Sequence, residues 1–331
     1  MDATPPGEEP PEHEPEPDLT DAEPEDGVAD QSDDNLVDAG DRDIGVFLIA
    51  PLAFGCWRFT HDDPARAQEV LEAALDAGID LVDTADAYGI DWGGAGFGAA
   101  EELLGTVLRQ APELRDRMLL ATKGGIRPPV PYDSSGPGIR QACEDSLRRL
   151  GVDHIDLYQI HRPDLFTHPS ELAMGLGKLR DEGKVGEVGV CNHRPDQHLA
   201  LQAHLSFDLV STQPELSVAH LDPFHDGTLD LALREGVTVL AWSPLAGGRV
   251  ASGEGLRPEL VTVLDELAER EEVDRAAVAI AFLLAHPSGP VPILGSQSPE
   301  RIVAGSRALS VHLDRADCYR ILQVAEGAPL P

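Results

Sequence analysis

Residues 155–190 read IDLYQIHRPDLFTHPSELAMGLGKLRDEGKVGEVGV, and this stretch decides the fold class. Two short apolar runs, at residues 155–160 and 185–190, flank a helical stretch at residues 170–182 that is rich in Leu and charged residues. Short apolar runs separated by one helix predict a βαβ unit, in which two parallel strands are joined by a crossover helix.

The same alternation continues along the chain after residue 34. Eight apolar runs predict strands, at residues 47–54, 79–82, 118–121, 155–160, 185–190, 209–212, 237–242 and 291–294. Helical stretches lie between them, for example at residues 64–77, 99–109, 138–150, 170–182 and 229–235. This alternation predicts an α/β fold, a (β/α)8 TIM barrel. A doubly wound sheet is the alternative, but no G-x-G-x-x-G follows the first run.

Three further segments have predicted structures. Residues 36–49 contain the turn signal Ala39-Gly40-Asp41, which predicts an N-terminal hairpin that caps the N-terminal mouth of the barrel. Residues 258–271 and 275–285 are two helical patterns before the last strand, so we expect one of them to be an additional helix. Residues 314–324 predict a closing C-terminal helix.

The negative charge of the chain is concentrated at its start. The 331 residues include 59 acidic and 25 basic side chains, a formal charge of −34, and residues 1–34 hold 14 of the acidic ones without any Lys, Arg or aromatic residue. Such a composition cannot bury enough apolar surface to offset the entropy of ordering. We therefore predict a disordered acidic tail at residues 1–34, either a solubilising extension or an interaction arm, followed by one barrel domain at residues 35–331.

Composition also excludes several partners. The few basic residues, three Lys and 22 Arg, predict no surface for nucleic acid. No apolar stretch approaches the roughly 20 residues that cross a bilayer, and the start of the chain lacks a secretory signal, so we expect a cytoplasmic protein with no membrane partner. The four cysteines stand singly, which fits neither a zinc site nor a disulfide framework and predicts reduced thiols.

Polar residues follow the predicted strands in a pattern that indicates a site. In a (β/α)8 barrel, chemistry takes place at the C-terminal ends of the strands. Those positions hold Asp83 and then Tyr88, Lys123, His161, Cys191 with Asn192 and His193, Gln213, Ser243, and Gly295 with Ser296. An acid, a phenol, an amine and an imidazole are therefore expected to meet in one cleft.

This set of side chains suits the reduction of a carbonyl group. The pKa of a free tyrosine is about 10 and a neighbouring ammonium lowers it, so we expect Lys123, held by Asp83, to lower the pKa of Tyr88. Tyr88 would give its proton to a developing alkoxide while His161 donates a hydrogen bond to the same oxygen.

A hydride source is the missing part of this chemistry, and nearby residues suit a nicotinamide. The amides of Asn192 and Gln213 can pair with its carboxamide, and Trp242 can stack on its ring.

Seven segments of the chain resemble, in order, the signatures of the aldo-keto reductase superfamily, and of its bacterial members with short loops in particular. They are Gly55-Cys56-Trp57, Asp83-Thr84-Ala85-Asp86-Ala87-Tyr88-Gly89, Thr122-Lys123, Gln159-Ile160-His161-Arg162-Pro163-Asp164, Gly189-Val190-Cys191-Asn192, Trp242-Ser243-Pro244-Leu245, and Gly295-Ser296 to Glu300-Arg301. The resemblance covers nearly everything after the tail and implies a (β/α)8 fold, NADP(H) as the usual cofactor and a small-molecule carbonyl substrate.

The resemblance also implies roles for individual residues. It places the catalytic tetrad on Asp83, Tyr88, Lys123 and His161. We assign cofactor binding to Cys56, Asn192, Gln213, Trp242, Ser243, Leu245, Gly247, Ser296 and Arg301. Ser296 and Arg301 match the pair that contacts the adenosine 2′-phosphate, which agrees with the fork of donors on Arg and with anion binding at a helix start. We expect Trp57, Trp92 and His193 to line the substrate pocket.

This chain departs from the family at three places. Cys191 stands where Ser is usual, and a thiol is a poorer hydrogen-bond partner. Gly295 stands where many members have Lys, and Ala304 and Gly305 stand where polar side chains often hold the adenine. These differences predict weaker NADP(H) binding than is typical, or better acceptance of NAD(H).

Two other functions are compatible with the sequence. One is a non-catalytic NADP(H)-binding regulatory or scaffold protein that engages a partner through its acidic tail. The other is a metal-dependent hydrolase with His161, His193 and Asp164 as ligands, although nothing in their spacing demands a metal and we predict none. The sequence leaves open the substrate, the direction of reaction and the oligomeric state.

Overall fold

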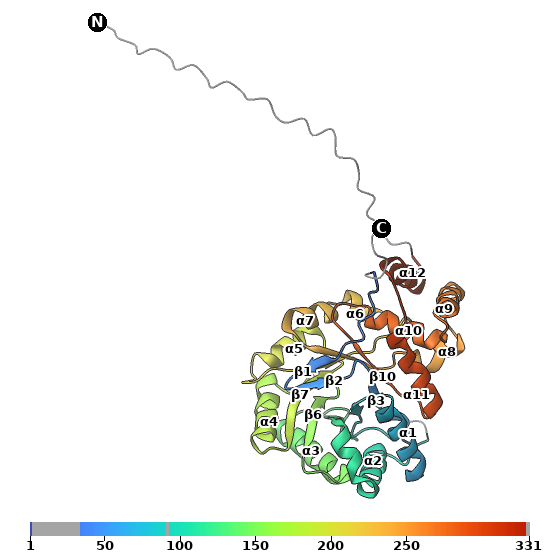
Figure 1. Cartoon of the computed structure of the whole chain (residues 1–331). Helices are drawn as coiled ribbons and strands as arrows, with labels where there is room; N and C mark the ends of the chain where they lie inside the picture. Colours follow the sequence, from blue (N-terminus) through green and yellow to red (C-terminus); the bar gives the residue numbers. More distant parts are fainter. Residues whose placement is uncertain (2–33, 91–92, 329–331) are drawn as a thin grey trace, which may run out of the picture. The chain divides into compact units, whose positions relative to one another are not determined.

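The computed structural model describes residue 1, residues 34–90 and residues 93–328, and its centre is a closed barrel of eight strands (Figure 1). The strands are β3 (Ala53–Gly55), β4 (Leu81–Asp83), β5 (Leu119–Gly124), β6 (Ile155–Ile160), β7 (Val185–Cys191), β8 (Ser211–Gln213), β9 (Thr238–Ala241) and β10 (Val291–Leu294). Each strand pairs in parallel with the next along the chain, and β10 pairs with β3 to close the barrel. The predicted (β/α)8 fold is confirmed.

Helices surround the strands, as Figure 1 shows. They are α1 (Pro64–Asp76), α2 (Ala99–Gln110), α3 (Gly136–Leu150), α4 (Pro169–Asp181), α5 (Pro195–Gln202), α6 (Asp222–His225), α7 (Thr228–Glu235), α8 (Arg249–Ser252), α9 (Pro258–Arg270), α10 (Arg275–Leu284), α11 (Pro299–Ser306) and α12 (Arg315–Glu326). Polar N-caps fix several starts. Asp63 caps α1 and Asp274 caps α10, each accepting from main-chain N–H groups of the first turn.

The additional helix before the last strand is α9. Every residue of α10 from Ala277 to Leu284 is buried, and α10 contacts β10, whereas α9 packs outside it against α10 and α12. The short helices α5, α6 and α8 were not among the sequence-based expectations, because segments of four to eight residues show too few turns for a clear helical period.

The first apolar run does not form one strand. Residues 47–54 divide into β2 (Phe47–Ile49), which pairs antiparallel with β1 (Arg42–Ile44), and the barrel strand β3. The hairpin turn lies at Gly45 and Val46, with Gly45 at a φ of 63°, and not at Ala39-Gly40-Asp41 as expected. The break after β2 is fixed by the main-chain N–H of Ala50, which donates to Asp80 Oδ1 at 2.9 Å instead of extending a ladder.

The hairpin closes the N-terminal end of the barrel. Ile44 and Ile49 are each 1% exposed and join the apolar cluster that fills the barrel interior, which includes Leu81, Leu119 and Leu157. The hydroxyl of Thr238, at the start of β9, donates to the main-chain oxygen of Asp43 at 2.5 Å. With this end filled, only the C-terminal ends of the strands are left to form a cleft.

Part of the sequence-based expectation falls outside the described residues. The predicted tail at residues 1–34 lies almost entirely in residues 2–33, and Trp92 is also outside, so the domain division at residue 34 stays a prediction. Within the described part of the chain, no helix combines the length and apolar character needed to cross a membrane.

Candidate active site

The strand ends bring the predicted tetrad together. Asp83 is the last residue of β4, Lys123 lies near the end of β5, and His161 directly follows β6. Tyr88 lies in the loop after β4, held by a hydrogen bond from its main-chain N–H to Ala85 O at 3.2 Å. The rings of Tyr88 and His161 meet edge to face, with their centroids 5.7 Å apart.

The ammonium of Lys123 is the centre of this cluster. Its Nζ donates to Asp83 Oδ2 at 2.6 Å, to Thr84 O at 2.8 Å and to the hydroxyl oxygen of Tyr88 at 3.0 Å. These three acceptors use all the donors of an ammonium. Because Tyr88 accepts from Lys123, the O–H of Tyr88 is left to donate elsewhere, into the cleft that Tyr88 lines.

Two amide side chains complete the environment of Asp83. Gln213 Nε2 donates to Asp83 Oδ1 at 3.1 Å, and Gln159 Nε2 donates to the same oxygen at 3.3 Å. Asp83 is therefore ion-paired through one oxygen and hydrogen-bonded through the other, although it is only 2% exposed. Burial without these partners would be costly for a carboxylate.

Lys123 acts to lower the pKa of Tyr88, as expected, but the net pKa is nevertheless raised. Burial raises the pKa of Tyr88 above the ordinary value, and the nearby Lys123 charge lowers it by less than burial raises it. For Lys123, burial works to lower the pKa, but the charge and hydrogen bond of Asp83, together with Tyr88 and Cys191, outweigh it and the net pKa is raised. At neutral pH the pair is thus a protonated phenol beside an ammonium, with a proton on Tyr88 to give.

His161 is a neutral imidazole in this environment. Burial, and then the charges of Lys123 and Arg162, lower the pKa of His161 well below its ordinary value. The side chain is 8% exposed and lines the cleft. A neutral imidazole has one N–H donor and one acceptor nitrogen, so His161 can donate a single hydrogen bond toward a bound oxygen.

Beyond the tetrad, the side chains after β7 and β9 hold one another in place. Trp242 Nε1 donates to Asn192 Oδ1 at 3.0 Å, and Asn192 Nδ2 donates to His161 O at 3.3 Å. Burial raises the pKa of Cys191 to about 12, so its thiol stays protonated and lies 3.6 Å from Gln213 Oε1. Asn192, Cys191, Gln213 and Trp242 all line the cleft.

The cleft has a volume of about 760 Å³ and extends from the tetrad to α11. Its far part is formed by Ser243, Leu245 and Gly247 after β9 and by Ser296 and Arg301 around the start of α11. Ser298 caps α11, with its side chain accepting from the main-chain N–H of Arg301, and the start of a helix favours anions. A volume of this size is in the range of sites for large cofactors.

The remaining predicted site residues are only partly in the cleft. Trp57 lines the cleft, whereas Cys56 and His193 are not among the described residues that line it. His193 Nδ1 lies 3.0 Å from Cys191 O, and Cys56 is fully buried. Trp92 lies outside the described residues.

Several lining residues were not assigned from the sequence, and three of them are charged: Arg58, Arg162 and Asp274. Arg58 and Arg162 directly follow Trp57 and His161, so their position next to predicted site residues could have identified them as lining residues. Asp274 gave no such signal, because it enters the cleft through the packing of α10.

Two other features of the described residues lie apart from this cleft. No group of three or more His, Cys, Asp or Glu among them is arranged to hold a metal ion, and Asp164 instead accepts from Ser134 N at 3.0 Å and from the hydroxyl of Thr167 at 2.7 Å.

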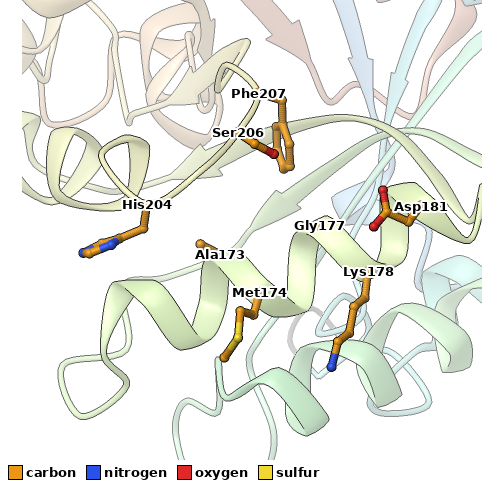
Figure 2. Close-up of a pocket in the computed structure, with 8 residues that line it drawn as sticks. All are labelled: Ala173, Met174, Gly177, Lys178, Asp181, His204, Ser206 and Phe207. Carbon is orange, nitrogen blue, oxygen red and sulfur yellow. The ribbon is translucent and has the colours of Figure 1, made fainter.

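A hollow of about 320 Å³ runs along one side of α4, facing His204, Ser206 and Phe207 after α5 (Figure 2). It contains no strand-end residue and lies outside the barrel, so we assign it no chemistry.

Comparisons with known proteins agree with this geometry. The sequence model described as the aldo/keto reductase family matches residues 51–326. The 6-dehydroglucose reductase of Novosphingobium aromaticivorans is 50% identical over 286 residues, which cover 86% of this chain and 94% of that protein. The 6-dehydroglucose reductase of Agrobacterium fabrum is 38% identical over 291 residues, which cover 84% and 95%.

A solved structure is similar as well. The crystal structure of an aldo/keto reductase from Klebsiella pneumoniae in complex with NADP and acetate has a TM-score of 0.71 and 26% identity to this chain, covering 86% of this chain and 94% of its own.

Proposed function

The chain belongs to the aldo/keto reductase family, and from this premise we propose that it is an NADP(H)-dependent reductase of aldehydes in which Tyr88 is the general acid. The observation that carries the proposal is the contact of Lys123 Nζ with both Asp83 and Tyr88 at the C-terminal ends of β4 and β5. It leaves a protonated phenol, backed by a fixed positive charge, in the wall of a large cleft.

Each residue of the tetrad has its own role in the proposed reaction. Tyr88 donates its proton to the carbonyl oxygen as negative charge develops there. Lys123 stabilises the phenolate that remains, and Asp83 holds Lys123 in position through a 2.6 Å ion pair. His161 donates a hydrogen bond to the same substrate oxygen, which stabilises the transition state electrostatically. In the oxidative direction the same groups act in reverse.

The shape and donor set of the cleft fit a dinucleotide. When bound, NADPH supplies the hydride for the carbonyl carbon. Asn192, Gln213 and Trp242 would hold the nicotinamide end, and Ser243, Leu245 and Gly247 the pyrophosphate. Ser296 and Arg301, at the start of α11, would bind the 2′-phosphate, because a helix start favours anions and Arg301 offers a planar fork of donors.

The substrate we propose is a polyhydroxylated aldehyde such as 6-dehydroglucose, the compound in the names of the two relatives. The substrate side of the cleft suits it, because Trp57 presents an aromatic ring and Arg162 a guanidinium beside His161. Rings of this kind pack against the apolar faces of sugars, and guanidinium groups donate to hydroxyls.

We expect the purified protein to consume NADPH when it is mixed with 6-dehydroglucose. The measurement is the loss of NADPH absorbance, with NADH in a parallel series and with nitrobenzaldehydes and simple ketones as comparison substrates. Consumption should be faster with NADPH than with NADH and faster with 6-dehydroglucose than with ketones. Tight binding of NADPH without turnover of any carbonyl compound would contradict the proposal and favour a non-catalytic role.

A second prediction tests the cofactor preference. We expect Arg301→Ala to raise the KM for NADPH by about 10- to 100-fold, the loss that follows removal of a hydrogen bond to a charged group. The KM for NADH should stay unchanged, because NADH has no 2′-phosphate.

Arg315→Ala is the matched control for Arg301→Ala. Arg315 is also an exposed arginine in the first turn of a helix, but it belongs to α12 and does not line the cleft. The Arg315→Ala variant loses the same positive charge as Arg301→Ala and should leave the KM values for NADPH and NADH unchanged. An equal rise of both KM values in Arg301→Ala would show that Arg301 does not bind the 2′-phosphate.

Two further expectations stay predictions. A cytoplasmic location is favoured by the four cysteines, which are all free thiols. The role of the acidic residues 1–34 is left to experiment on the full-length chain.

A further inference from the structure

Asp86 is a buried carboxyl group that the mechanism above does not use. It lies two residues before Tyr88, it is 1% exposed, and no side chain within residues 34–90 and 93–328 hydrogen-bonds to its carboxyl oxygens, although the main-chain N–H of the adjacent Ala87 lies close to them. Its main chain is nevertheless fixed, because the N–H of Asp86 donates to Lys123 O at 3.0 Å. A buried polar group held in place without a partner calls for an explanation.

The charged groups around Asp86 do not neutralise it. Lys123 is ion-paired with Asp83 at 2.6 Å, and Arg149 on α3 is ion-paired with Glu101 on α2 at 2.7 Å. Burial, and then repulsion by Glu101, raise the pKa of Asp86 well above its ordinary value, and Arg149, the main-chain N–H of Ala87 and Lys123 only partly offset them. The carboxyl group is therefore protonated at neutral pH and has an O–H to donate.

The inner nitrogen of His161 is an acceptor that lies close to that proton. His161 Nδ1 lies 4.0 Å from Asp86 Oδ1, is itself buried, and also has no hydrogen-bond partner among the described residues. The separation exceeds a hydrogen bond by about 1 Å. A rotation of the Asp86 carboxyl group can close it, since no side chain among the described residues holds either oxygen.

We propose that Asp86 is a positioning residue, whose protonated carboxyl group donates a hydrogen bond to His161 Nδ1 and so keeps the imidazole proton on Nε2, the nitrogen left to face the cleft. The proposal rests on the function proposed above for His161. In a neutral imidazole the partner of one nitrogen decides which nitrogen carries the proton. An ionised Asp86 would instead accept from Nδ1–H, which would leave Nε2 as an acceptor unable to donate to a carbonyl oxygen.

Two substitutions separate these arrangements. Asp86→Asn keeps a donor, because the amide N–H can bond to Nδ1 as the acid O–H does, so we expect it to retain most of the wild-type kcat. Asp86→Leu keeps the size but removes the donor, and we expect kcat to fall about tenfold, the loss expected for one buried hydrogen bond, with the KM for NADPH unchanged. His198→Leu is the control, because it removes another buried polar side chain, on α5 and away from the cleft, whose Nδ1 has no partner among the described residues, and it should not change kcat.

A second measurement reads the tautomer without any turnover. In full-length protein labelled with ¹⁵N-histidine, long-range ¹H–¹⁵N spectra at neutral pH should show the His161 proton on Nε2 in the wild type and in Asp86→Asn, and a tautomer mixture in Asp86→Leu. The His161→Gln variant identifies the His161 signals. A wild-type proton on Nδ1, or an Asp86→Asn variant as slow as Asp86→Leu, would overturn the proposal.

The two proposals fail in different ways. If no carbonyl compound is reduced but the wild-type proton lies on Nε2 and becomes mixed only in Asp86→Leu, the proposed function is wrong and the role of Asp86 stands. If turnover is as expected but the tautomer is the same in all three proteins, the role of Asp86 is wrong and the proposed function stands.

Discussion

We expect Tyr88→Phe to lower kcat for aldehyde reduction by at least about 100-fold, the low end of the contribution of a positioned general acid. The variant removes only the hydroxyl, which accepts from Lys123 at 3.0 Å and carries the proton that the substrate oxygen needs. The ring and its edge-to-face contact with His161 are kept, so the site should fold normally. The measurement is NADPH consumption under saturating substrate, together with NADPH binding followed by fluorescence.

Binding and turnover must be read together for this variant. NADPH binding should match the wild type, because the hydroxyl contacts Lys123 and not the far part of the cleft. Tyr319→Phe, which removes an exposed hydroxyl on α12, is the matched control and should keep full activity. Wild-type turnover in Tyr88→Phe would remove Tyr88 from the role of general acid.

The second large effect is expected for Lys123→Met. The side chains of Lys123 and Asp83 are 0% and 3% exposed, so losing the ammonium leaves a buried carboxylate without its charge partner. Breaking a buried pair in this way costs about 3–5 kcal/mol of the free energy of unfolding. Turnover should also fall by about 100-fold or more, because the phenolate of Tyr88 loses its stabilising charge. Urea unfolding and NADPH consumption measure the two effects.

The double variant Asp83→Asn with Lys123→Met separates stability from catalysis. It removes both charges, and the Asn side chain can still accept from Gln213 and Gln159 as Asp83 does. We expect it to recover most of the lost stability, since no unpaired charge stays buried, while turnover stays low. Recovery of turnover together with stability would mean that Lys123 acts only through folding.

The positions of the tetrad could be predicted from the sequence because a parallel barrel places every strand end on the same side. Once the apolar runs at residues 79–82, 118–121 and 155–160 are recognised as strands, Asp83, Lys123 and His161 must share one face. Their separations could not be predicted, because they depend on strand register, for example the pairing of Asp83 with Ala121 and of Lys123 with Gln159.

The hairpin shows that the local sequence pattern was insufficient to predict the strand boundaries. Residues 47–54 form one apolar run in the sequence, yet β2 and β3 belong to different sheets. The division depends on the carboxylate of Asp80, about 30 positions further along the chain, which accepts from Ala50 N. Contacts of that range leave no local periodicity to detect.

The sequence by itself determined the barrel, the end of the barrel at which the polar strand-end residues gather and the candidate reacting groups, because these follow from apolar periodicity and from chain order. Only the tertiary structure decided how those groups are charged. Burial outweighs the Lys123 charge and raises the pKa of Tyr88, and the pairing of each nearby cation with another carboxylate leaves Asp86 protonated beside His161. Ionisation depends on the solvent that packing removes and on the distances that packing sets, and neither quantity is local in sequence.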